Sequence, residues 1–288
     1  MILILVDKKI IRDALKEDIG RDDITTNCLI DKNKKSKFLL VVNEDAILAG
    51  IEVFKQAFLL LDENIKVKSK CADGKRIYKK SIIAEVSGNT RSILKAERVA
   101  LNFISHLSGI ATLTNELVKL INGTGATLLD TRKTTPNLRY FEKEATLSGG
   151  AKNHRFNLSD MVLIKDNHIA NCKSVKEAIL KASHLRKKGV KIEVEIDNAN
   201  FKDLLLAISC KPNIIMFDNW SIKNLRKAVK LVPSYIKTEA SGSINKKNIR
   251  AYAESGVNYV STSYMIRNAK WVDFSLDAVV TTNHFKQL

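Results

Sequence analysis

An α/β fold with parallel strands is the architecture that this sequence predicts, and the second half of the chain carries the observations that predict it. From residue 127 onward, short apolar segments alternate six or seven times with segments of helical apolar spacing. Such units of strand, loop and helix favour a parallel sheet with its helices outside. Their most economical closure is a TIM-like α/β barrel. A doubly wound sheet is disfavoured because no GxGxxG segment follows the first strand.

The predicted barrel has a regular order of elements. Its strands are expected at 127–130, 161–165, 191–196, 213–217, 236–239 and 258–261, and its helices at 175–187, 201–208, 222–231 and 246–255. No further strand–helix unit follows residue 270, so we expect the tail to return to the first domain. The predicted domains are therefore 1–108 joined by 270–288, and a barrel over 109–269.

The part of the chain before the barrel is predicted to be a separate α/β domain. Its helices are expected at 8–16, 51–61 and 92–108, and its strands at 38–43, 46–49, 65–70 and 81–87. Residues 22–26 are interpreted as a loop and the start of a strand. Gly109 is expected to interrupt the long helix, whose pattern resumes over 111–121.

The charge of the chain suggests an anionic partner. Lys and Arg outnumber Asp and Glu by 48 to 31, which gives a net charge of +17. Much of this excess lies on predicted helix surfaces, as in 173–188, where it is typical of a solvated face. A nucleic-acid-binding protein is disfavoured, because aromatic residues make up only 6% of the chain and do not alternate with basic ones.

The cysteines and the apolar segments indicate a cytoplasmic protein. Cys28, Cys71, Cys172 and Cys210 form neither a CxxC pair nor a zinc pattern with His. Unpaired thiols suit a reducing compartment. The apolar start lacks a basic region and reaches Asp7 too early for a signal peptide. No apolar stretch approaches the roughly 18 residues of a membrane span.

Polar side chains are concentrated where the predicted barrel strands end, at the edge where parallel strands converge. They are Asp130, Arg132, Lys133, Lys165, Asp166, His168, Glu195, Asp197, Asp218, Glu239, Ser241–Ser243 and Ser261–Ser263. Arg and Lys among them suit carboxylate or phosphate groups. The two serine-rich turns let backbone N–H groups approach a phosphate. Glu195 and Asp218 suit Mg²⁺ or a developing positive charge.

Several segments resemble one family along nearly the whole chain. They read EDIG at 17–20, DITT at 23–26, ERVALN at 97–102, DTRKTTP at 130–136, GG at 149–150, NHR at 153–155, LIKDNHI at 163–169, EVE at 193–195, FDN at 217–219 and EASG at 239–242. In this order they resemble the quinolinate phosphoribosyltransferases. The resemblance implies the type II phosphoribosyltransferase fold, with an α/β sandwich domain followed by an open, mostly seven-stranded α/β barrel. It also implies a homodimer or higher oligomer.

The activity that the resemblance implies is transfer of phosphoribosyl from 5-phosphoribosyl 1-diphosphate to quinolinate with decarboxylation. The products are nicotinate mononucleotide, diphosphate and CO₂, as in NAD biosynthesis, and Mg²⁺ is the implied cofactor. No side chain is a certain Mg²⁺ ligand. The ion is expected to bind the diphosphate, and Glu195 and Asp218 are the candidate protein ligands.

Roles for individual residues are also implied by position. Arg132, His154 and Arg155 would hold the quinolinate carboxylates, and Arg98 would reach them from the partner subunit. Lys133 and Lys165 would lie between the two substrates, and Glu195 and Asp218 would face the ribose. Thr131 is also expected to bind substrate. The 5′-phosphate would be held by Ser241, Gly242, Ser243, Ser261, Thr262 and Ser263. Catalytic roles are expected for Lys133, Lys165, Glu195 and Asp218.

The chain departs from the family pattern at three positions. Asn137, Ala151 and Ser263 each stand where the family usually has Gly. Asn tolerates a left-handed backbone, so Asn137 is a mild change. Ser263 would either crowd the phosphate or add a donor to it.

Alternative functions remain within and outside this family. A transferase acting on nicotinate is disfavoured because Arg132, His154, Arg155 and Arg98 exceed what one carboxylate needs. A molybdenum-linked homologue of the same fold differs around TRKT and LIKDNH. A pyridoxal-phosphate barrel enzyme is suggested by Lys165 at a strand end with phosphate turns after it, and a yellow colour would reveal it.

Overall fold

The computed structural model describes residues 2–279, and the side chains from residue 8 onward. The chain divides into two compact units. The first contains the chain up to Leu113, then Thr135–Gly149 and the segment from Ala269 onward, whereas the second contains Thr114–Thr134 and Gly150–Asn268. The predicted domain limits, 1–108 with 270–288 and 109–269, did not anticipate that 135–149 groups with the first unit.

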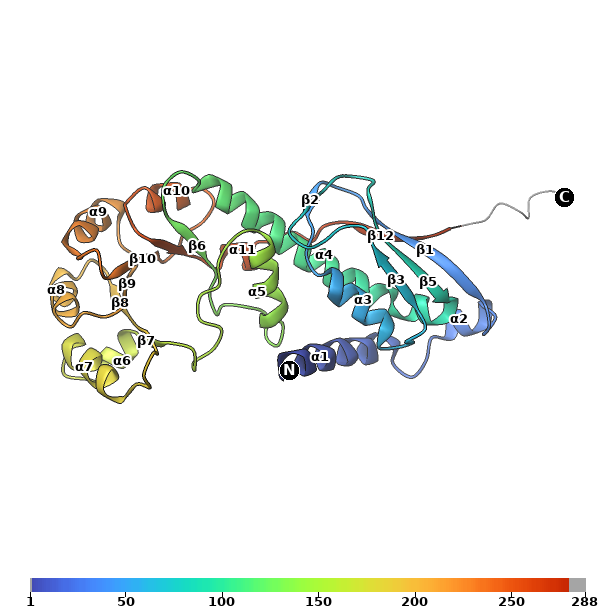
Figure 1. Cartoon of the computed structure of the whole chain (residues 1–288), viewed down its shortest axis with the longest axis horizontal. Helices are drawn as coiled ribbons and strands as arrows, with labels where there is room; N and C mark the ends of the chain where they lie inside the picture. The colour runs from blue at the N-terminus through green and yellow to red at the C-terminus, as the bar shows by residue number, and fades with distance from the viewer. Residues whose placement is uncertain (1, 280–288) are drawn as a thin grey trace. The chain divides into compact units, whose positions relative to one another are not determined.

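The first unit is built on an antiparallel sheet with the strand order β12-β1-β5-β3 (Figure 1). Its strands are β1 (Lys35–Val42), β3 (Lys66–Ser69), β5 (Ile82–Asn89) and β12 (Phe274–Ala278). A small second sheet pairs β2 (Ala46–Ile47) with β4 (Arg76–Ile77). β1 buries every second residue from Phe38 to Val42, as expected of a strand with one face on a core. The end of the described chain therefore completes a sheet that begins near its start.

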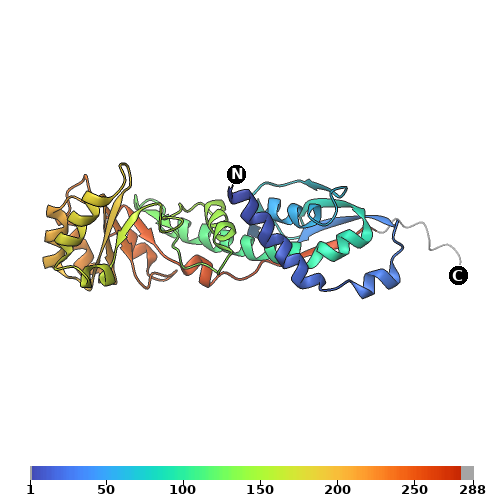
Figure 2. The same ribbon diagram turned by 90° about the horizontal axis from the view of Figure 1, so that it is seen from below.

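Five helices belong wholly or partly to this unit. They are α1 (Ile2–Ile19), α2 (Ile24–Leu29), α3 (Ile51–Leu59), α4 (Thr90–Leu120) and α5 (Arg139–Ser148). Figure 2 shows α1 lying across α3, and Ile11, Leu15, Phe54 and Phe58 are buried there. The prediction of a loop and strand at 22–26 is wrong, because the Asp23 carboxylate accepts the Thr26 N–H and starts α2.

Helix α4 is continuous, so the predicted interruption at Gly109 is also wrong. A Cβ atom on Gly109 would lie 2.1 Å from the backbone oxygen of Lys270. The glycine therefore serves close approach of another backbone, and not a break in the helix. The helix interior tolerates it because its other apolar residues, such as Ile104 and Leu107, are fully packed.

The second unit is an open barrel made from a six-stranded parallel sheet in the order β6-β11-β10-β9-β8-β7. Its strands are β6 (Thr127–Leu129), β7 (Val162–Ile164), β8 (Ile192–Asp197), β9 (Ile214–Asp218), β10 (Lys237–Ser241) and β11 (Tyr259–Ser261). Six described strands stand where the resemblance implied mostly seven. In addition to these six strands, Lys152 forms a single parallel bridge with Leu129 of β6.

Helices cover the outside of this sheet. They are α6 (Asp166–Ala170), α7 (Val175–Leu185), α8 (Phe201–Ser209), α9 (Ile222–Leu231), α10 (Ile249–Ala253) and α11 (Tyr264–Arg267). Figures 1 and 2 both show α7, α8 and α9 outside β7–β9. The buried Trp220 donates its indole N–H to the Ile196 oxygen at 2.7 Å and packs edge-on against Phe217. This packing fixes the ends of β8 and β9.

Among the described residues, no helix combines the length and the apolar character needed to span a bilayer.

Candidate active site

The predicted site residues of the second unit lie where its parallel strands end. After β6 come Thr131, Arg132 and Lys133, and after the Lys152 bridge come His154 and Arg155. Lys165 follows β7, Glu195 lies in β8, and Asp218 ends β9. The last two strands end in serine-rich turns, which are Ser241, Gly242 and Ser243 at β10 and Ser261, Thr262 and Ser263 at β11. Because all strands are parallel, these ends form one mouth. Arg98 is an exposed residue of α4 in the first unit.

Strand β8 supplies a column of carboxylates to the inside of the barrel. Its sequence alternates Glu193, Glu195 and Asp197 with the buried apolar residues Ile192, Val194 and Ile196. Side chains on a strand alternate between its two faces, so the three acids share the inner face. An inner face made of acids is unusual for a barrel core, which is normally filled by branched apolar residues.

Lys165 and Glu195 form an ion pair at the mouth. The Lys165 ammonium donates to Glu195 Oε2, and Glu195 is almost fully buried. Burial raises the pKa of Glu195, and the lysine opposes that change. Two predicted site residues from different strand ends are therefore in contact. Lys133 is not part of this ion pair, and it is exposed. Its backbone N–H donates to Thr131 Oγ1 at 3.0 Å.

A second carboxylate group joins Glu195 to its neighbours. One oxygen each of Glu195, Asp197 and Asp218 lies within 4.8 Å of the others. Burial raises the pKa of Asp197, and repulsion by Asp218 and Asp166 adds to the rise. Asp197 was seen as a strand-end residue in the sequence but was not among the predicted site residues. The signal that could have found it is its alternation with Glu193 and Glu195.

Arg132 and Arg155 bring two guanidinium groups together. Burial lowers the pKa of Arg155, and repulsion from Arg132 lowers it further. Arg155 Nη1 donates to the Met161 backbone oxygen at 3.1 Å, which directs the guanidinium along β7. Two cations held this close favour an anion with more than one charged group between them.

The His154 side chain is only 7% exposed, and it lies among buried acids. Its backbone N–H donates to Asp130 Oδ1 at 2.8 Å, and Asp130 is fully buried. Its Nε2 lies 3.0 Å from Glu193 Oε2 and 3.7 Å from Glu239 Oε2. Both glutamates are fully buried. These three acids were not predicted as site residues, although each stands at a position where a barrel interior would otherwise be apolar.

Glu193 and Glu239 have strongly raised pKa values. Desolvation raises the pKa of Glu193 to about 7. Desolvation, followed by the charge of Glu193, raises the pKa of Glu239 to about 8. Two adjacent carboxyl groups without access to water cannot both ionise at low cost, so the pair retains a proton near neutral pH.

The turn after β10 has no room for a side chain at its centre. Gly242 has φ of +92°, and a Cβ atom on it would lie 2.5 Å from the Asn219 backbone nitrogen. Ser243 follows with φ of +52°, a left-handed conformation that is costly for Ser. The Asn219 N–H donates to the Ser241 oxygen at 3.1 Å and fastens this turn to the end of β9.

The turn after β11 is more buried than the turn after β10. Ser261, Thr262 and Ser263 are all buried. Thr262 Oγ1 donates to the Ile244 oxygen at 2.7 Å and accepts the Tyr264 N–H at 3.0 Å. Ser263 has φ of −91°, so its backbone conformation does not require the usual glycine.

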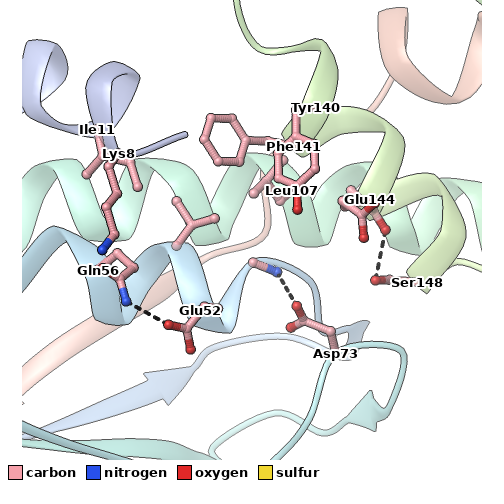
Figure 3. Close-up of a pocket in the computed structure, with 13 residues that line it drawn as sticks. Lys8, Ile11, Glu52, Gln56, Asp73, Leu107, Tyr140, Phe141, Glu144 and Ser148 are labelled. Carbon is pink, nitrogen blue, oxygen red and sulfur yellow. Dashed lines mark hydrogen bonds between the residues drawn. The ribbon is translucent and has the colours of Figure 1, made fainter. Parts of the chain in front are cut away.

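A separate cavity of about 370 Å³ lies in the first unit (Figure 3). Ile11, Leu107 and Phe141 form part of its apolar wall. Burial raises the pKa of Glu144 at its edge, with Asp73 adding to the rise. None of the predicted site residues lines this cavity, so we assign the chemistry to the barrel mouth.

Two family models match the chain. The model for the quinolinate phosphoribosyl transferase N-terminal domain matches residues 23–108. The model for the C-terminal domain of the same family matches residues 110–277.

Curated relatives and solved structures agree with these models. The chain is 40% identical over 280 residues to a probable nicotinate-nucleotide pyrophosphorylase (carboxylating) of Bacillus subtilis, covering 97% of this chain and 96% of that protein. It is 35% identical over 286 residues to a quinolinate phosphoribosyltransferase (decarboxylating) of Nicotiana tabacum, covering 93% and 81%. The structure of the nicotinate-nucleotide pyrophosphorylase from Francisella tularensis superposes with a TM-score of 0.90 at 37% identity, over 95% and 96% of the two chains.

Proposed function

This chain belongs to the quinolinate phosphoribosyl transferase family, and from that premise we propose that it transfers phosphoribosyl from 5-phosphoribosyl 1-diphosphate to quinolinate. The transfer is coupled to decarboxylation and yields nicotinate mononucleotide, diphosphate and CO₂. The chain is thus a pentosyltransferase of NAD biosynthesis. Its relatives of Bacillus subtilis and Nicotiana tabacum carry the same activity in their names.

The observation that carries this assignment is the pair of Arg132 and Arg155 at the barrel mouth. Partial burial lowers the pKa of Arg155, and repulsion from Arg132 lowers it further. A planar dicarboxylate offers one carboxylate to each guanidinium, in the bidentate geometry that Arg favours. Nicotinate has a single carboxylate and would match only one of the two guanidinium groups.

The remaining mouth residues suit the charges that develop during the reaction. Loss of diphosphate from C1 of the ribose develops positive charge there, and the Glu195 carboxylate is placed to stabilise it. The quinolinate nitrogen then supplies the electron pair of the new N–C1 bond. As the carboxylate next to that nitrogen leaves as CO₂, its bonding electrons are accepted by the pyridinium ring, and a proton takes the vacated position. Lys133 and Lys165 supply positive charge beside both anionic substrates.

Mg²⁺ is the proposed cofactor, and Glu195, Asp197 and Asp218 are the residues that would hold it. Their oxygens lie within 4.8 Å of one another, and carboxylate oxygens are the donors that Mg²⁺ prefers. Asp197 Oδ1 is buried and has no hydrogen-bond partner among the residues described. When bound, the ion would neutralise charge on the diphosphate leaving group.

Binding of Mn²⁺, followed by electron paramagnetic resonance, tests this cofactor site without using activity. Asp197→Asn should weaken Mn²⁺ binding by about tenfold, because one anionic oxygen is lost. Glu254→Gln, at an exposed carboxylate on the end of α10, is the matched control and should bind as the wild type does. Equal binding by Asp197→Asn and the wild type would remove Asp197 from the site.

The activity is tested by mixing the protein with 5-phosphoribosyl 1-diphosphate, Mg²⁺ and either quinolinate or nicotinate, and following product mass. Nicotinate mononucleotide should form from quinolinate alone. Glu195→Ala and Lys133→Ala should each lower kcat by at least about tenfold, since each removes a charge from the reacting centre. Turnover of nicotinate only would overturn the substrate, and a full-speed Glu195→Ala enzyme would overturn the role of this carboxylate.

The assembly that we propose is a homodimer or larger oligomer in which Arg98 serves the site of the partner subunit. Arg98 is exposed on α4, and it has the residue type that suits a carboxylate of quinolinate. Arg98→Ala and Lys133→Ala should each be inactive alone. After mixing and random subunit exchange, half of the dimers are heterodimers with one intact site of two. The mixture should therefore recover roughly a quarter of the wild-type activity. No recovery despite exchange would show that each site takes both residues from one subunit.

We also propose a cytoplasmic location. The proposal rests on the four cysteines, all of which are free in the described structure.

A further inference from the structure

His168 is a residue of the mouth to which the proposed function gives no role. It is the third residue of the short helix α6, three positions after Lys165, and it is exposed. The Lys165 backbone N–H donates to His168 Nδ1 at 3.0 Å. In return, the Lys165 backbone oxygen accepts the His168 N–H at 2.9 Å. His168 therefore contacts both polar groups of the Lys165 backbone.

Lys165 stands where the chain leaves the support of the sheet. Strand β7 is the last in the order of the parallel sheet, and β8 is its one neighbour among the described strands. The pairing of β7 with β8 ends at Ile164. The next backbone N–H, that of Lys165, lies beyond this ladder and needs another acceptor. The His168 ring supplies that acceptor at the residue that carries the ammonium of the mouth.

This contact determines the tautomer of the His168 ring. A ring nitrogen that accepts a hydrogen bond carries no proton, so neutral His168 has its proton on Nε2. Rotation of the ring by half a turn would place a carbon atom against the Lys165 N–H. Two properties of His168 are thus fixed by the geometry, namely the accepting atom and the position of the proton.

We propose that His168 is a positioning residue that acts through Lys165. Its Nδ1 atom holds the Lys165 backbone, so that the ammonium stays beside Glu195 and the substrates. The ammonium donates to Glu195 Oε2, and Glu195 is fixed within β8. The four-carbon stem of lysine is flexible, so a released backbone would let the ammonium move away. The inference rests on the proposed function, because Lys165 serves the transfer reaction there.

Substitutions of similar shape test which atom of His168 matters. Asn places its Oδ1 near the position of Nδ1, whereas Leu has a similar shape and no acceptor. His168→Leu should lower kcat by about tenfold, because the ammonium is displaced, and His168→Asn should keep kcat within about threefold of the wild type. Neither variant should disturb the core, since His168 is exposed. Wild-type kcat in His168→Leu would overturn the proposal.

A third variant separates positioning from direct binding of substrate. Gln places its amide near the position of Nε2 and does not reach the Lys165 N–H in the same way. His168→Gln should therefore lose activity as His168→Leu does. Recovery by His168→Gln without recovery by His168→Asn would overturn the proposal, because Nε2 would then be the atom that the reaction needs.

A double-mutant cycle tests whether the effect passes through Lys165. In a Lys165→Met background, His168→Leu should change the remaining kcat by less than about threefold, because the ammonium that it would displace is missing. The same tenfold loss in both backgrounds would overturn the proposal. A general loss of folded protein would also act equally in both backgrounds, and thermal unfolding identifies it.

Nitrogen-15 NMR of protein labelled at histidine tests the geometry without using activity. The His168 signals are assigned by their absence from His168→Asn, and in alkaline buffer they should show the proton on Nε2. A proton on Nδ1 would overturn the proposal even in a fully active enzyme. Wild-type protein that has the Nε2 proton and does not use quinolinate would instead refute the proposed function.

Discussion

Gly242 lies in a turn with no space for a side chain. Its φ of +92° is uncommon for any residue with a Cβ atom, and Asn219 occupies the space that such an atom would need. The glycine lets the backbone after β10 pass close to Asn219 at the end of β9. The sequence predicted this turn from its small residues, and the structure supplies the steric reason.

Gly242→Ala should therefore damage phosphate binding more than folding. A Cβ atom 2.5 Å from the Asn219 nitrogen forces the turn outward, and we expect the KM for 5-phosphoribosyl 1-diphosphate to rise by about tenfold or more. Steady-state kinetics with both substrates measure the effect. Ser243→Gly is the control, since it relieves a left-handed Ser and should raise the free energy of unfolding by up to about 1 kcal/mol. Unchanged kinetics in Gly242→Ala would contradict the assigned turn.

Ser263 was the departure that the sequence comparison singled out, yet the backbone strain lies at Ser243. Ser263 has an ordinary φ of −91°, whereas Ser243 has φ of +52°. A substitution for glycine can be judged only when the backbone angle at that position is known, and residue identity alone does not provide the angle.

At the scale of single elements, β8 shows what a sequence pattern predicts and what it leaves out. The strand was predicted almost to its limits, because Ile192, Val194 and Ile196 recur at strand spacing. The roles of the acids between them differ, since Glu195 contacts Lys165 while Glu193 lies against His154. Those partners come from β7 and from the Lys152 bridge region, and only the fold brings them to β8.

Helices were predicted less evenly. Those outside the barrel follow apolar spacing and were found within a few residues, as for α9 (Ile222–Leu231). The short α2 was missed because its start depends on one capping contact, from Asp23 to the Thr26 N–H. α5 was not predicted, although Phe141 and Ala145 are buried along it, because Glu142 and Lys143 are buried with them and obscure the apolar pattern.

Gly109→Ala is expected to lower stability, although alanine normally favours a helix. The added Cβ atom would lie 2.1 Å from the Lys270 backbone oxygen, so α4 or the chain near Lys270 must move, at a cost of about 1–3 kcal/mol. Thermal unfolding by circular dichroism measures the change. Asn102→Ala, at an exposed position of the same helix, is the control and should be neutral or slightly stabilising. A Gly109→Ala protein as stable as this control would show that the close approach is dispensable.

For the molecule as a whole, raised carboxyl pKa values should shape the dependence of stability on pH. Burial raises the pKa of Glu97 and Glu144 in the first unit, and of Glu193 and Glu239 in the second. An acid whose pKa is higher in the folded state retains a proton that the unfolded chain has released. Stability therefore falls as pH rises between the unfolded value, near 4.5, and the folded value.

Glu239→Gln tests this dependence. Each proton retained only by the folded state costs about 1.4 kcal/mol of unfolding free energy per pH unit, and Glu239 contributes up to its pKa of about 8. The melting temperature of the wild type should fall between pH 5 and pH 9, and that of Glu239→Gln should fall less. Gln has nearly the same volume as Glu and does not ionise, so the substitution removes the titration with little change in packing. Identical slopes for the two proteins would show that Glu239 does not hold a proton in this range.

The pairing of β12 with β1 has a consequence for how the enzyme is made. One edge of β1 pairs with β5, which is translated soon after it. The other edge pairs with β12, which is translated more than 200 residues later. At synthesis rates of about 5–20 residues per second, the other edge of β1 stays open for on the order of ten to fifty seconds. An open strand edge is a template for pairing with another chain. Nascent copies on neighbouring ribosomes therefore face a hazard that ends only when β12 has been translated and can pair with β1.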